Sequence, residues 1–117
     1  AIQAFDSIAL NSRLIGDHDL VEITLTMTID ELPNQLDQIN AHLQTRDINL
    51  LLTQLHRLKG IAANGSAILL AELCETLEQV AKSDSIDAVI HRLPDLEQAI
   101  SDFIQQAEDY LLRNKSC

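Results

Sequence analysis

One short segment, from Leu55 to Gly65, holds the side chains best suited to chemistry. The imidazole of His56 is largely neutral at pH 7, and a neutral imidazole is a nucleophile toward phosphorus. Lys59 follows three residues later, so on a helix its ammonium group lies one turn from the ring. That cation would disfavour the imidazolium form and would balance phosphoryl oxygens held on the ring. These residue types at this spacing could therefore support nucleophilic chemistry at His56, with Lys59 balancing negative charge.

The pattern of apolar residues in this segment decides which way His56 points. On a helix, the core-facing stripe falls nearly opposite His56, so the imidazole must face solvent. That stripe consists of Leu51, Leu55, Leu58 and Ala62. The outward face around His56 is small and apolar, because it carries Leu52, Gly60 and Ala63.

Gly60 is an unusual choice inside a helix, where glycine costs about 1 kcal/mol relative to alanine. Its missing side chain would let a loop of another protein approach His56 closely. An exposed Leu52 would offer that partner an apolar contact. Arg57, to one side of His56, is as readily a partner contact as a solubilising surface charge. We therefore predict a partner-binding surface of Leu52, Arg57, Gly60 and Ala63 around His56.

The elements that would position this face are five helices, each preceded by a capping side chain. Their expected ranges are 7–14 after Asp6, 18–45 after Asp17, 48–63 after Asp47, 67–82 after Ser66 and 86–112 after Ser85. Gly16 should end the first helix. Pro33 predicts a kink in the second helix, and Pro94 predicts a bend or a new first turn in the last.

Residues 21–30 alternate between apolar and polar side chains, which taken alone would indicate a strand. No other segment alternates in this way, and a lone strand has no partner to pair with. Apolar residues from Val21 to Leu43 also recur at steps of three and four, which makes a continuous stripe on a helix. The sequence therefore predicts an all-α fold: an antiparallel up-down four-helix bundle with a short extra N-terminal helix, formed by residues 1–117 as a single domain.

The composition excludes several classes of function. The 117 residues are 46% hydrophobic with only three aromatic side chains, so the core must be aliphatic. A net charge of -10 disfavours nucleic acid and anionic lipid surfaces as partners. No apolar run is long enough for a membrane span, and no signal peptide is recognisable. No glycine-rich phosphate loop occurs, so we expect no ATP site. Cys74 and Cys117 suit a reducing, cytoplasmic setting.

The remaining polar residues give no sign of a second site. His18, His42 and His91 are interpreted as ordinary surface or helix-end residues. The histidines and cysteines lack metal-ligand spacing, so we predict no metal and no bound cofactor. The acidic residues Glu72, Glu75 and Glu78 are most simply a solvated face.

The order His56-Arg57-Leu58-Lys59-Gly60, followed by Ala62-Ala63-Asn64, resembles the signature of histidine-containing phosphotransfer domains. The resemblance extends over nearly the whole chain. It includes Phe5-Asp6 and Arg13–Asp17 at the entry, Asp30–Pro33 in the long helix, Asp47 before the histidine helix, and Leu73–Glu78 after it. Two positions depart from the family pattern: Ile61 stands where a small residue is usual, and Gly65-Ser66 stands where an apolar residue and a glycine are usual.

The resemblance implies that His56 is the phosphoacceptor through Nε2, that Lys59 assists the phosphoryl group, and that Gly60 gives room to a partner. It implies a phosphocarrier in a bacterial His–Asp phosphorelay, which takes the group from the aspartate of one receiver domain and passes it to another. The receiver would bring Mg²⁺ and most of the catalysis, so this chain would be an intermediate in phosphotransfer rather than a self-sufficient enzyme. We further expect a monomer, either free-standing or the C-terminal domain of a hybrid sensor kinase. The alternatives left open are a non-catalytic helical interaction module and, more remotely, an enzyme with its own small substrate.

Overall fold

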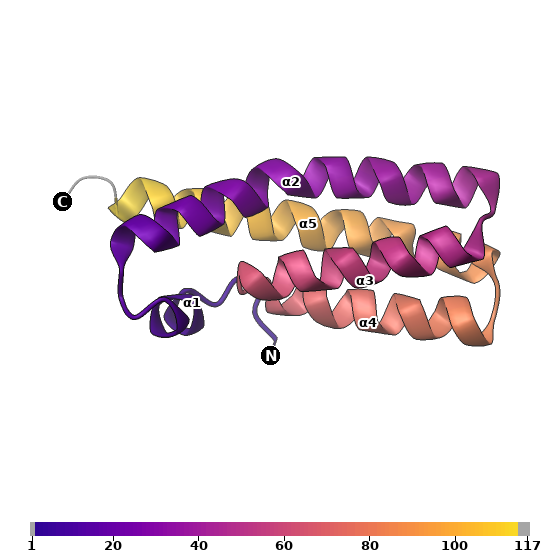
Figure 1. Ribbon diagram of the computed structural model, residues 1–117, viewed down its shortest axis with the longest axis horizontal. Coiled ribbons are helices and arrows are strands. Elements are labelled where there is room, and N and C mark those ends of the chain that lie inside the picture. Colours follow the sequence, from indigo (N-terminus) through magenta and orange to yellow (C-terminus); the bar gives the residue numbers. More distant parts are fainter. Residues whose placement is uncertain (1, 115–117) are drawn as a thin grey trace.

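Four long helices run antiparallel along a common axis, and a short fifth helix lies across one end of them (Figure 1). The computed structural model describes residues 2–114. Its helices are α1 (Ser7–Arg13), α2 (His18–Thr45), α3 (Ile48–Asn64), α4 (Ile68–Ser83) and α5 (Ile86–Asn114). Residues 2–114 contain no strand. The all-α bundle is confirmed, and each expected helix boundary lies within two residues of the observed one.

The helices begin where side chains can satisfy their free backbone N–H groups. The carboxylates of Asp6, Asp17 and Asp47 accept from the first turns of α1, α2 and α3. The hydroxyl of Ser85 accepts from the N–H of Ala88, at 3.2 Å, at the start of α5. Four of the five expected caps are therefore confirmed.

The fifth expected cap, Ser66, is wrong. The residue that precedes α4 is Ala67, which makes no side-chain capping bond. Ser66 instead takes a left-handed conformation with a φ of 56°, and its hydroxyl accepts a hydrogen bond from Arg13 at 2.8 Å. Gly65 keeps a φ of -89°. The turn between α3 and α4 thus places its left-handed residue one position after the glycine.

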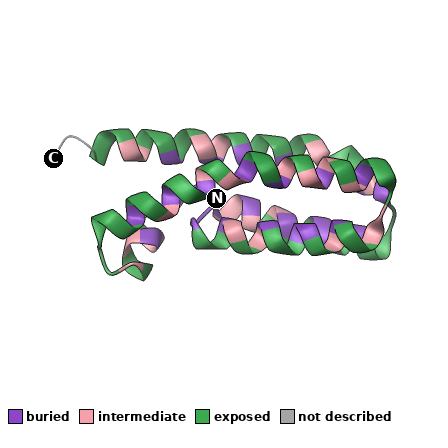
Figure 2. Cartoon of the chain, turned by 45° about the horizontal axis from the view of Figure 1, so that its top comes forward, coloured by how far each residue is buried: buried purple, intermediate pink, exposed green. Residues whose placement is uncertain are grey.

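The core is aliphatic, as the composition predicts. Figure 2 shows the buried residues as stripes along the helices, and the expected stripe of α3 is fully buried. Among the buried residues of the other long helices are Val21, Leu25, Leu32, Ile39, Leu70, Leu77, Val89, Leu96 and Phe103. Residues 21–30 are helical because this period-four burial outweighs their local alternation.

Both prolines lie inside continuous helices. α2 continues through Pro33, and its axis changes direction about midway along its length (Figure 1). This agrees with the expected kink, since a proline removes one backbone donor and crowds the preceding turn. α5 also continues through Pro94, so no new helix begins there.

α1 covers an end of the bundle that the shorter helices leave open. α2 and α5 have 28 and 29 residues, whereas α3 and α4 have 17 and 16. In the space beyond the α3–α4 turn, Leu10 of α1 is fully buried and Phe5 packs edge-to-face on Phe103 and Tyr110, with ring centroids 5.6 Å apart in each pair. Backbone and side-chain bonds from this segment to the turn hold α1 beside the end of α3.

Candidate functional site

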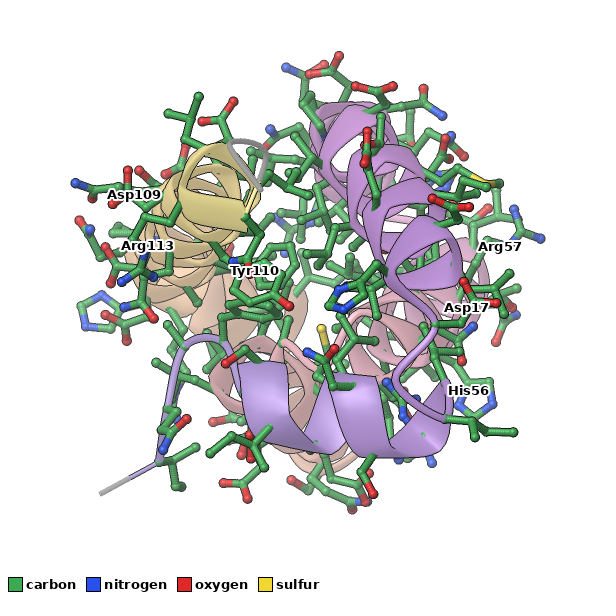
Figure 3. All side chains as sticks on the ribbon, turned by 90° about the vertical axis from the view of Figure 1, so that its left-hand side faces the viewer. Asp17, His56, Arg57, Asp109, Tyr110 and Arg113 are labelled. Atoms are coloured by element: carbon green, nitrogen blue, oxygen red, sulfur yellow. The ribbon has the colours of Figure 1, made fainter. Side chains whose placement is uncertain are left out.

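His56 lies on the outer face of α3 and points into solvent. Its side chain is 76% exposed, whereas Leu55 and Leu58 beside it are fully buried. Figure 3 shows His56 and Arg57 projecting outward on the same side of the bundle as Asp17. The helical stripe that predicted this orientation is therefore confirmed.

The other predicted site residues lie near His56 on α3, with one difference in exposure. Gly60 is exposed, and a Cβ atom built there would meet nothing within 4 Å. Arg57 and Ala63 are exposed as well. Leu52, which we expected to be exposed, is partly buried against the core. The expectation was wrong because Leu52 directly follows the core residue Leu51 and lies at the edge of the stripe.

Lys59 does not stand alone beside the imidazole. Its ammonium group forms an ion pair with the carboxylate of Glu75 on α4. The hydrogen bond within this pair raises the pKa of Lys59 and lowers the pKa of Glu75. The side chains are 36% and 51% exposed, so the pair lies at the surface of the α3–α4 interface.

The environment of Glu78 also differs from the sequence interpretation. Its side chain is only 11% exposed, so it does not belong to a solvated acidic face. The Oε1 atom is buried without a hydrogen-bond partner among residues 2–114, and it faces Nδ1 of His56 at 3.4 Å. A signal was present in the sequence: Glu78 lies four residues after the buried Cys74 and next to Leu77, at the edge of the buried stripe of α4.

A shallow hollow opens near the C-terminal end of α3, between that helix, α2 and the end of α1. It has a volume of about 460 Å³. Its lining residues are Arg13, Leu14, Thr24, Met27, Thr28, Glu31, Ile61 and Asn64. Met27 is 67% exposed, and Leu20 and Ile23 precede it on the same face of α2 at 47% and 54% exposure. An apolar surface therefore leads from the start of α2 to the α3 turn that follows Gly60.

Other kinds of site are not found in the part of the chain that the structure describes. No three His, Cys, Asp or Glu side chains of residues 2–114 gather closely enough to hold a metal ion. None of the helices in that range has the length and apolar character needed to cross a bilayer. His18 and His91 are exposed and His42 is partly so, without a neighbouring charge pair. His56, Lys59, Glu75 and Glu78 therefore form the cluster of polar side chains on α3 and α4 that is best suited to chemistry.

Comparison with known proteins identifies the family to which this fold belongs. Residues 24–110, well over half of the chain, match the sequence profile of the Hpt domain. No curated protein sequence gives a significant match.

Two solved structures share the fold over nearly the full length. Histidine-containing phosphotransfer protein B (HptB) from Pseudomonas aeruginosa PAO1 is 22% identical, with a TM-score of 0.86 over 97% of this chain and 98% of that chain. The HPT domain of an Hpt sensor hybrid histidine kinase from Shewanella is 17% identical, with a TM-score of 0.81 over 97% of both chains. At these identities the likeness establishes the fold, and the profile match establishes the family. The chain belongs to the Hpt domain family, the phosphotransfer carriers of His–Asp phosphorelays, whose partners are the receiver domains of response regulators.

Proposed function

We propose that His56 is the residue that carries the phosphoryl group in this chain, through its Nε2 atom. The observation that supports this most strongly is the position of the ring. It is 76% exposed, but its Nδ1 edge faces a buried carboxylate. One nitrogen is thus turned toward the protein, and the other is left to a partner.

Glu78 would select the nitrogen that reacts. A neutral imidazole carries one proton, and the hydrogen bond made by one nitrogen determines which tautomer is present. The 3.4 Å between Nδ1 and Oε1 is slightly longer than a hydrogen bond, and a small ring rotation would close it. With the proton on Nδ1 facing Glu78, the lone pair of Nε2 points outward, toward the phosphorus of an incoming phosphoaspartate. Glu78 is therefore a positioning residue.

The receiver domain would dock over the outward face of α3 and the exposed start of α2. Gly60 and Ala63 place no large side chain on the surface beside His56, and Arg57 lies next to the imidazole on the same helix. Ile15, which lies between α1 and α2, also supports this docking surface because its apolar side chain is 93% exposed. Its backbone holds a φ of 59°, which is an unfavourable conformation for a β-branched residue. Met27 and the hollow beside it extend the apolar surface. Leu52 would contribute only its exposed edge.

The chemistry would be shared unequally between the two proteins. Phosphoryl transfer requires in-line positioning and neutralisation of charge. The receiver would supply its aspartate and Mg²⁺, and this chain would supply the imidazole, with no cofactor of its own. The carrier would act as a cytoplasmic monomer, either free-standing or as the last domain of a hybrid sensor kinase of bacterial type.

The test is transfer of labelled phosphate from a phosphorylated receiver domain to the chain. The parent should acquire acid-labile, base-stable phosphate. His56→Gln should acquire none, although its melting temperature should equal that of the parent. His91→Gln is the matched control, because His91 is an exposed helix histidine that should not affect labelling. Equal labelling of His56→Gln and the parent would refute the assignment of the site. Receiver binding without label transfer to any of the three proteins would favour a purely structural interaction module.

A further inference from the structure

The ion pair between Lys59 and Glu75 has a consequence for how firmly the phosphoryl group is held. We propose that Glu75 is the resting partner of Lys59, and that the ammonium group exchanges from Glu75 to the phosphoryl oxygens once His56 is phosphorylated. Glu75 would then set the stability of the phosphohistidine by competing for its counter-charge. This inference rests on the proposed role of His56.

The geometry allows the exchange. Lys59 lies three residues after His56, so its flexible side chain starts one turn from the ring, on the same face of α3. Its partner Glu75 projects from α4, across the interface between the two helices. Since both side chains are partly exposed to water, the pair is weak and exchanges readily. The ammonium group can therefore leave Glu75 without unfolding either helix.

The negative charges around the His56 imidazole make the exchange of Lys59 unfavourable for the stability of the phosphohistidine. A phosphoryl group on Nε2 brings close to two negative charges to a surface that already holds the carboxylates of Glu75 and Glu78. Lys59 is the only ammonium or guanidinium group for which the described residues show a bond to either of these carboxylates. When it moves to the phosphoryl group, Glu75 loses its bonded partner and keeps only the unbonded charge of Lys82 nearby. Phosphorylation therefore breaks one ion pair to form another, and the phosphohistidine is less stable than it would be beside a free lysine.

Such a cost suits a carrier, because a group that is held less firmly is passed on more readily. Replacing Glu75 by glutamine would free the ammonium group while keeping the size of the side chain. The fraction of chain phosphorylated at equilibrium should rise, with the phosphorylated-to-free ratio increasing about two- to fivefold, the range expected for an exposed ion pair.

A small-molecule donor tests this without a receiver. Phosphoramidate transfers its phosphoryl group when its P–N bond breaks and ammonia departs with the bonding electrons. The new P–Nε2 bond forms, and the surplus ring proton passes to solvent. At a fixed ratio of phosphoramidate to ammonium chloride, ³¹P NMR reports the phosphorylated-to-free ratio of the chain. The ¹⁵Nζ signal of Lys59 should also shift on phosphorylation of the parent, which a merely structural role would not require.

The controls separate partner exchange from a general charge effect. Glu72→Gln removes the same charge one turn away on α4 and should leave the ratio near that of the parent. In a Lys59→Met background, Glu75→Gln should lose its effect on the ratio. An unchanged ratio in Glu75→Gln, an equal rise in Glu72→Gln, or a full effect without Lys59 would each overturn the inference. Failure of the parent to be phosphorylated on His56 would instead refute the proposed function.

Discussion

Gly60→Ala separates what the site requires from what the fold requires. Gly60 lies in the interior of α3, where alanine is favoured over glycine by about 1 kcal/mol. The added methyl group would meet no atom within 4 Å, so no packing cost offsets this gain. We expect the variant to unfold about 3–6 °C above the parent, as that free energy implies for a domain of this size.

The same methyl group should impair transfer from a receiver. It would stand one turn from His56, on the face where we propose that the receiver docks. A displacement of about 1 Å in the reacting groups can cost about a hundredfold in rate. We expect the initial rate of transfer from a phosphorylated receiver to fall about ten- to hundredfold. Phosphorylation by phosphoramidate should stay at the parent rate, because so small a donor does not need the space above Gly60.

Gly65→Ala is the converse variant. A Cβ atom at Gly65 would lie 2.9 Å from Cγ2 and 3.0 Å from Oγ1 of Thr28, a buried residue of α2. Overpacking of this kind costs typically 1–3 kcal/mol, so we expect Gly65→Ala to be less stable in chemical denaturation, while the folded variant still accepts the phosphoryl group from a receiver.

Two results would refute this account of Gly60. One is a Gly60→Ala variant that accepts the phosphoryl group from a receiver as fast as the parent does, and the other is a Gly60→Ala variant that is less stable than the parent.

Three further outcomes follow from the structure. In urea titrations, the free energy of unfolding of Ser66→Gly should be about 1 kcal/mol higher than that of Ser66→Ala. Both variants lose the side-chain hydroxyl, but only glycine adopts the left-handed conformation without steric strain. Burial raises the pKa of Cys74 to about 12, so in a Cys117→Ser variant a thiol reagent at pH 8 should react only after denaturant is added. The cationic partners of Glu75 and Asp87 lower the pKa values of these two carboxyl groups, so each ion pair stabilises the fold at pH values above the pKa of the unfolded chain. That stability is lost as the pH falls through the lowered pKa of the folded protein. Acid unfolding curves of Glu75→Gln should therefore show a weaker pH dependence below about pH 4.5 than those of the parent.

The fold could be predicted because each helix carries its own signals. Asp6, Asp17 and Asp47 cap helices that begin within one residue of them, and the apolar stripes match the buried faces. Ser66 misled for a local reason. Serine before an apolar run is a typical N-cap, but here the chain must turn sharply between two packed helices. A left-handed residue is required there, and that requirement belongs to the tertiary packing.

The orientation of His56 could be predicted for the same reason, since it depends on the period of one helix. The partners of His56 could not. Glu75 and Glu78 lie on α4, and whether a given residue of α4 meets α3 depends on how the two helices are rotated against each other. We interpreted Glu78 from the sequence as part of a solvated face, and even its place next to the buried stripe of α4 would not say which residue of α3 it faces.

That rotation follows from burial of the apolar stripe of α4, which includes Leu70, Cys74 and Leu77, and the short turn of residues 65–67 joins the two helices in this arrangement. Successive helix residues are separated by about 100°, so inserting one residue into α4 between Leu70 and Cys74 would turn the following part of the helix by that angle relative to the part before it. Glu75 and Glu78 would then move away from Lys59 and His56 together, even if both helices stayed intact. The bonds from Arg13 to Ser66 and to Asn64 brace this turn from the other side. Ser66 thus supports the site indirectly, because it lies in the turn that joins α3 to the helix whose Glu75 and Glu78 the phosphoryl group proposed on His56 would face.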